Sequence, residues 1–101
     1  MKLLTKEIIK KATKQYDLGS DMNQTVVAKY FNPTGQGTWY LMNMAKDNDY
    51  CWGICNLYEW EMGSFSMKEL ESVRFSFGLK IERDLHFAPI KASELWEKLT
   101  N

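Results

Sequence analysis

The sequence has one histidine, two cysteines and no glycine-rich phosphate loop, and each scarcity excludes a class of chemistry. With His86 as the only imidazole, a metal site built on two histidines is impossible, and a zinc site of cysteine and histidine lacks donors. No serine, histidine and aspartate, or cysteine and histidine, stand in an order that indicates nucleophilic catalysis. We therefore predict a protein that is not an enzyme, with no catalytic residue, no metal and no cofactor.

Net charge and long apolar runs are missing as well. Thirteen basic and thirteen acidic residues cancel, so no overall field draws the protein to nucleic acid or to an anionic membrane. No run of about 18 apolar residues occurs, and the N-terminal apolar stretch is too short for a signal peptide. These absences predict a cytoplasmic protein.

The two cysteines, Cys51 and Cys55, are four residues apart. On one strand their Cα atoms would lie about 13 Å apart, beyond the reach of a disulfide. We expect two buried free thiols, which fit a reducing compartment.

The length and composition indicate one folded domain. A chain of 101 residues can bury one core but not two, so residues 1–101 are predicted to form a single domain. Aromatic residues make up 14% of the chain, which favours a sheet, where such side chains fit a half-buried pleated surface.

Turn residues and hydrophobic spacing predict an α+β fold. A helix capped by Thr5 is expected through about residue 16, and Ser66 with Glu69 has the spacing of a capping box for a short helix over 67–73. A third helix is expected over 92–100, after Pro89. The predicted strands cover 25–31, 38–46, 50–60, a short run at 64–66 and an extended segment near 85–87. Together they form an antiparallel meander sheet of three to five strands.

Both faces of the 50–60 strand are predicted to be apolar, because side chains alternate along a strand. Either helices and loops cover both faces of the sheet, or one face is partly open and serves as an interface. On the second interpretation the aromatic side chains are candidates for binding a partner protein: Trp39, Tyr40, Trp52, Tyr58 and Trp60.

The stretch GLKIERDLHF, residues 78–87, concentrates charge around the only histidine. On a strand, Glu82, Asp84 and His86 would share a face, so a hydrolytic or metal-binding cluster is geometrically feasible. The interpretation we favour is a structural clasp in which Arg83 and Asp84 pair with neighbours. A third interpretation is that Arg83 and Asp84 bind a partner protein. The expected clasp neighbours are Arg74, Glu69 and Glu71.

Lysines form a stripe along the outer side of the predicted first helix. Lys6, Lys10 and Lys14 could contact phosphates, which makes them candidates for nucleic-acid binding. The later part of the chain is acidic, however, and a dipolar surface with exposed aromatic residues suits protein recognition better. The acidic residues there are Glu59, Glu61, Glu69 and Glu71.

Five segments, in order along nearly the whole chain, form a recognisable pattern: LLTKEI (3–8), TWY (38–40), WGICN (52–56), GSFSMKELESVR (63–74) and GLKIERDLHF (78–87). They resemble a family known only as a domain of unknown function, found in small proteins of bacterial plasmids, integrative elements and phages. Two departures are Ser64, where the family pattern has an aromatic residue, and Lys80, where it has proline.

The resemblance brings no mechanism, but it implies a mobile-element setting in bacteria or phages. Combined with the residues, it leads to one main expectation: a non-enzymatic accessory protein that acts by binding another protein, in a setting that suggests countering host defence. It would work in the bacterial cytoplasm, or in the host cytoplasm if phage-borne. A nucleic-acid binder using Lys6, Lys10 and Lys14 is the first alternative, and a hydrolase or metal protein centred on Glu82, Asp84 and His86 is the second.

Overall fold

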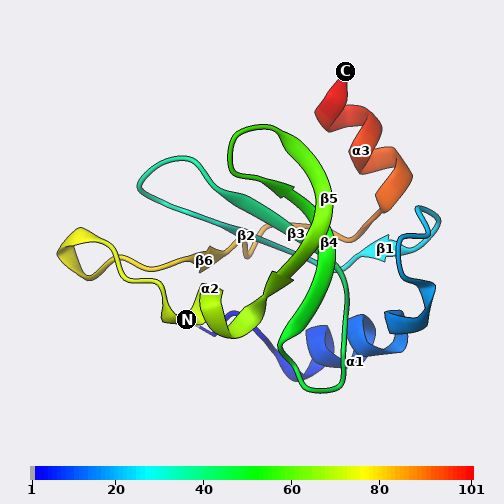
Figure 1. The fold of residues 1–101 in the computed structure, drawn as a ribbon, viewed down its shortest axis with the longest axis horizontal. Coiled ribbons are helices and arrows are strands. Elements are labelled where there is room, and N and C mark those ends of the chain that lie inside the picture. The colour runs from blue at the N-terminus through cyan, green and yellow to red at the C-terminus, as the bar shows by residue number, and fades with distance from the viewer. Residues whose placement is uncertain (1) are drawn as a thin grey trace.

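The fold, seen in a computed structural model that describes residues 2–101, is the predicted α+β class (Figure 1). The helices are α1 (Lys6–Lys14), α2 (Met67–Ser72) and α3 (Ala92–Thr100), with short 3₁₀ turns η1 (Tyr16–Leu18) and η2 (Ser76–Gly78). The strands are β1 (Thr25–Val26), β2 (Ala28–Phe31), β3 (Thr38–Met44), β4 (Tyr50–Asn56), β5 (Trp60–Ser66), β6 (Glu82–Arg83) and β7 (Ile90–Lys91). Within residues 2–101, no helix is long and apolar enough to cross a membrane.

The strands form two antiparallel sheets. The main sheet has the order β5-β4-β3-β2-β6, and β1 pairs with β7 in a separate two-stranded sheet. The predicted strand over 25–31 is therefore divided: Val27 separates its two parts, and its backbone N–H donates to the Leu41 carbonyl at 2.8 Å. Pairing of β1 with β7 is what brings α3 back against the sheet.

Helix α1 begins where the sequence indicates and ends earlier than predicted. The Thr5 hydroxyl accepts a hydrogen bond from the Ile8 backbone N–H at 3.1 Å, which confirms the predicted cap. The helix ends at Lys14 because the Gln15 side chain turns to the sheet. Its amide donates to the Thr25 and Met42 carbonyls, each at 2.8 Å, and so ties the helix end to β1 and β3.

The predicted strand over 50–60 is wrong in its second half. Strand β4 ends at Asn56, residues 57–59 form a loop, and the chain reverses into β5. The loop carries Tyr58, a residue type that favours strands, whereas β5 carries Glu61 and Gly63, which do not. Residue propensities therefore favoured a strand where the loop lies and disfavoured one where β5 lies.

A β-bulge in β3 explains a strict requirement for glycine in β4. Leu41 lies opposite Gly53 and Asn43 opposite Trp52, so Met42 is the extra residue. At this bulge the β3 backbone comes so close that a Cβ on Gly53 would overlap the Tyr40 carbonyl oxygen.

Each face of the sheet carries its own core, although Tyr50 and Met62, on the face of Ile54, stay 47% and 38% exposed. Helices α1 and α2 pack on the first face, and α3 packs on the second (Figure 1). The first core includes Leu41 and Cys51, and the second includes Met42 and Ile54, in the alternation predicted for a strand. Asn43 is also buried, and its amide donates to the Gln24 side chain at 2.8 Å.

Candidate functional site

Strand β5 forms one edge of the main sheet. It pairs with β4 along all seven of its residues, and no other described strand pairs with its outer side. In such an edge strand, alternate residues direct backbone N–H and C=O groups away from the sheet. A seven-residue edge is longer than the two-residue β6 at the opposite edge.

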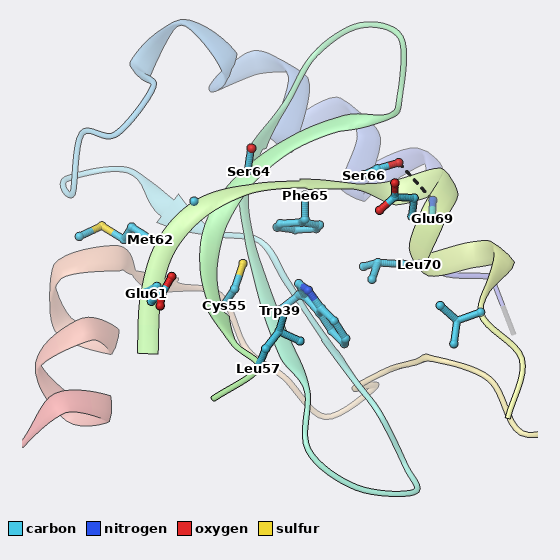
Figure 2. Close-up of a pocket in the computed structure, with 12 residues that line it drawn as sticks. Trp39, Cys55, Leu57, Glu61, Met62, Ser64, Phe65, Ser66, Glu69 and Leu70 are labelled. Atoms are coloured by element: carbon cyan, nitrogen blue, oxygen red, sulfur yellow. Dashed lines mark hydrogen bonds between the residues drawn. The ribbon is translucent and has the colours of Figure 1, made fainter. Parts of the chain in front are cut away.

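A groove of about 410 Å³ lies beside this edge, on the face that carries α1 and α2. Figure 2 shows the rings of Trp39 and Phe65 and the side chain of Leu70 turned toward its centre. Gly63 forms part of the lining, and a Cβ placed on it would meet no atom within 4 Å. We call this the edge groove, and its residues are Trp39, Cys55, Leu57, Glu61, Met62, Gly63, Ser64, Phe65, Ser66, Glu69, Leu70 and Val73.

The edge groove is mostly apolar at its centre and acidic at its rim. Glu61 and Glu69 line it, and both side chains are exposed. Within residues 2–101 neither glutamate forms an ion pair, since the ion pairs there involve only Glu7 and Asp84 among the acids. The rim therefore presents negative charge to any segment that enters.

The wall formed by α2 is fixed by two caps. The Ser66 hydroxyl accepts from the Glu69 backbone N–H at 3.1 Å, as the predicted capping box requires. Asp49 adds a second cap from the β3–β4 loop, because its carboxylate accepts from the Ser66 hydroxyl and from the Lys68 backbone N–H, the latter at 3.0 Å. These hydrogen bonds hold the pKa of Asp49 below its ordinary value.

The two thiols are free, and burial favours their protonated form at neutral pH. Cys51 is buried in the first core, and Cys55 lines the edge groove. Burial raises the pKa of Cys51 to about 12 and that of Cys55 to about 11, the latter with a smaller contribution from the Glu61 carboxylate. Because the thiolate is the nucleophile, the raised pKa disfavours covalent chemistry at Cys55, which contributes part of the groove surface.

The five candidate aromatic residues do not gather at one place. Trp39 alone lines the edge groove. Tyr40 is buried in the second core, with its ring centroid 5.8 Å from those of Trp60 and Phe87. Trp52 and Trp60 are half-buried against the same core, and Tyr58 is 92% exposed at the tip of the β4–β5 loop. Within residues 2–101 the five side chains therefore form no single patch, and of the five only Trp39 lines the edge groove.

The charged stretch 78–87 contains a clasp, with partners other than those predicted. The Arg83 Nε donates to the Lys2 carbonyl at 3.1 Å. Asp84 pairs with Lys29 at 3.7 Å, and its backbone N–H donates to the Lys29 carbonyl at 2.9 Å. Arg74, expected as a neighbour, donates to the Glu71 and Val73 carbonyls instead. The clasp thus joins the N-terminal segment and β2, because β6 pairs with β2.

Glu82, Asp84 and His86 do not converge on one point. Glu82 lies in β6 opposite Phe31, and the chain then turns, with the Asp84 carboxylate accepting from the His86 backbone N–H at 2.9 Å. His86 is exposed. Within residues 2–101, no three His, Cys, Asp or Glu side chains lie close enough to hold a metal ion. The strand geometry on which the cluster depended ends at Arg83.

The lysines of the N-terminal stripe are exposed, as predicted. Lys6, Lys10 and Lys14 all lie on α1. Lys6 and Lys14 line hollows beside the helix, whereas Lys10 does not. Lys6 and Lys14 therefore lie next to these hollows, and Lys10 lies apart from them.

Sequence reasoning missed most of the edge groove. Phe65, Leu70 and Val73 were expected only as parts of local elements, and Leu57 as a strand residue. The one feature of the sequence that pointed to the groove was the acidic character of residues 59–71, which contribute its rim. Nothing in the sequence marks Phe77, which is fully exposed at the tip of η2 with a φ of 62°.

Comparison with known proteins gives a family and nothing further. A family model described as "Protein of unknown function (DUF2958)" matches residues 2–101. No curated protein matches the chain, and no solved structure matches it.

Proposed function

This chain belongs to the DUF2958 family, and we propose that it is a non-enzymatic module that binds an extended segment of another protein along β5. One observation carries the proposal: a seven-residue edge strand with no partner on its outer side borders an apolar groove. Backbone groups and side-chain space that an extended peptide requires are thus adjacent.

Strand addition accounts for how such a segment would be held. A peptide that pairs with a sheet edge gains affinity from main-chain hydrogen bonds, and it gains specificity from pockets that accept alternate side chains. The outward backbone groups of β5 would form the main-chain hydrogen bonds, and the edge groove would accept the side chains. The groove has a volume of about 410 Å³, toward the lower end of the range for ligand sites, about 300–1,000 Å³. It suits one or two side chains.

The lining indicates the chemistry of the segment. Trp39 and Phe65 offer ring surfaces to an apolar side chain, and aromatic anchors dominate the energetics of many interfaces. Glu61 and Glu69 favour lysine or arginine on either side of that anchor. The proposed ligand is therefore a basic extended segment with an apolar or aromatic residue at its centre.

The biological setting is also a proposal. The family resemblance of the sequence supports an accessory protein of a bacterial mobile element or phage, acting in the bacterial or host cytoplasm to counter host defence. Genes that adjoin members of this family on plasmids, integrative elements and phages would test it. Members found mainly among chromosomal housekeeping genes would contradict it.

The binding proposal is tested by panning a library of random heptapeptides on the purified protein. We expect enrichment of sequences in which an apolar residue is flanked by lysine or arginine. Gly63→Val should abolish their binding, because the new side chain occupies open groove space without meeting the fold. Glu61→Gln should weaken it, whereas Glu97→Gln, an exposed change on α3, is the matched control.

Two results would contradict the proposal. One is enrichment of peptides whose binding is unaffected by Gly63→Val. The other is a chain that forms dimers through β5 in solution, seen as twice the monomer mass by light scattering, because self-pairing would occupy the same edge.

A further inference from the structure

A second groove runs along α1, apart from the edge groove. It consists of two hollows of about 470 and 480 Å³. Lys11, Val27 and Pro89 line both hollows, so the two are continuous. One wall is the helix, and the opposite wall is formed by β1, the start of β2 and the segment that leads from β6 to Pro89.

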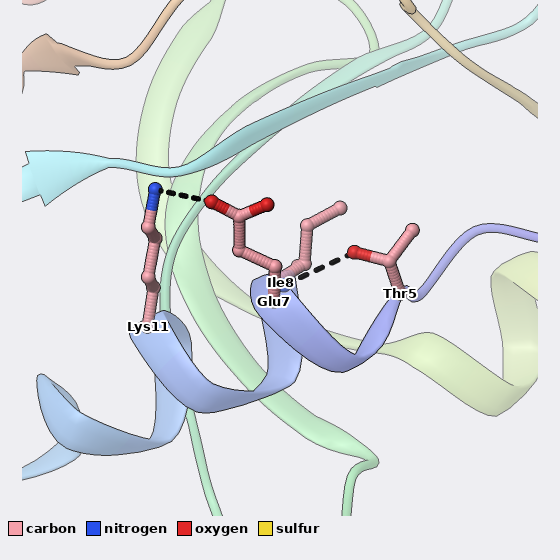
Figure 3. Close-up of polar contacts among 4 residues, drawn as sticks. All are labelled: Thr5, Glu7, Ile8 and Lys11. Atoms are coloured by element: carbon pink, nitrogen blue, oxygen red, sulfur yellow. Dashed lines mark hydrogen bonds and ion pairs between the residues drawn. The ribbon is translucent and has the colours of Figure 1, made fainter.

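The charge along this groove is positive. Its two acidic residues are already paired: Glu7 with Lys11 at 3.0 Å, as Figure 3 shows, and Asp84 with Lys29 at 3.7 Å. The hollow toward the C-terminal end of α1 has no acidic residue in its lining. The cations along the groove are Lys6, Lys11, Lys14 and Arg83. Within residues 2–101, Lys6 and Lys14 form no ion pair.

The floor and far wall also carry apolar side chains, beside the charged Arg83 and Asp84. Ile8 and Val27 form part of the lining, and Leu85 stands opposite the helix with 62% of its surface exposed. A nucleic-acid backbone needs cations that are open to its phosphates and gains little from such side chains. A protein segment, in contrast, can bury its own apolar side chains against these apolar residues.

We infer that this lysine-lined groove is a second docking surface, which binds an acidic protein segment carrying apolar side chains. The nine residues of α1 correspond to about 13 Å of helix, the length of about four extended residues. The edge groove and the lysine-lined groove have opposite charge, so segments of opposite charge can bind to them together. A protein with both surfaces would bridge two partners, or two segments of one partner.

The inference is tested by titrating the ¹⁵N-labelled protein with a short peptide in which two leucines are flanked by aspartates. Backbone chemical shifts of residues 5–18, 25–28 and 83–89 should change, and those of residues 60–73 should not. A matched peptide with lysines in place of the aspartates should give the reverse pattern if the edge groove also binds as proposed. The two surfaces are therefore scored separately in one spectrum, and failure at one is distinguishable from failure at the other.

Two lysine variants on the same helix separate this surface from a nucleic-acid site. Lys14→Gln should weaken binding of the aspartate peptide about two- to fivefold, the range for an exposed ion pair. Lys10→Gln should leave it unchanged, because Lys10 does not line the groove. Equal loss in both variants, tighter binding of a DNA duplex than of the peptide, or shift changes outside the three segments would each overturn the inference.

Discussion

Replacing Gly53 with alanine should be among the most damaging single changes in this chain. The added Cβ would overlap the Tyr40 carbonyl oxygen and lie 2.9 Å from the Tyr40 carbonyl carbon. Both are backbone atoms at the β3 bulge, so relief requires a strand to move. Overpacking of this kind costs about 1–3 kcal/mol and sometimes more, and with a backbone atom in the way we expect about 3 kcal/mol or more.

That loss is a large share of the total stability, which is about 5–15 kcal/mol for a typical domain. It corresponds to a fall in Tm of about 12 °C or more. The four tryptophans allow unfolding in urea to be followed by fluorescence, alongside thermal unfolding followed by circular dichroism.

The control is Gly63→Ala, directly across the same strand pair. A Cβ on Gly63 meets no atom within 4 Å, so the free energy of unfolding should change by no more than about 0.5 kcal/mol. If Gly53→Ala proves as stable as Gly63→Ala, the close approach of β3 and β4 described above is wrong.

Two further changes test the contacts around the grooves. The lowered pKa of Asp49 means that its contribution to stability is complete above the ordinary carboxyl pKa of 3.8 and is lost as pH falls through the lower folded value. Asp49→Asn should therefore flatten the decline in unfolding free energy over that acidic interval, measured in urea at a series of pH values, and an unchanged slope would remove the proposed cap. Arg83→Ala should lower the free energy of unfolding by about 1–2 kcal/mol through loss of its hydrogen bond to the Lys2 carbonyl. The exposed change Lys80→Ala is its control, and equal stability of the two variants would contradict the clasp.

Local signals in the sequence were sufficient for the starts of α1 and α2. Thr5 and Ser66 are caps whose hydroxyls act within three residues, so their roles are readable from spacing alone. The alternation of Cys51 and Ile54 between faces was readable for the same reason. Such features depend on backbone geometry that repeats along the chain.

Features that depend on contacts between residues far apart in the chain could not be predicted from the sequence. The bulge at Met42 depends on how β3 meets β4, and the Asp84–Lys29 pair depends on β6 joining the edge of β2. The edge groove combines Trp39 with Phe65 and Leu70, which only the tertiary fold brings together. The chain reversal at 57–59 could not be predicted because Leu57 continues the apolar run of β4 and Tyr58 is a residue type that strands favour.

Amide hydrogen exchange along β5, measured with and without a bound lysine-flanked peptide, tests strand addition most directly. In the free protein, alternate amides of Trp60–Ser66 that face away from β4 should exchange rapidly. When the peptide is bound those same amides should become protected, while the amides already bonded to β4 stay as they were. Binding that leaves the outward amides of β5 exchanging as before would contradict the account, whatever its affinity.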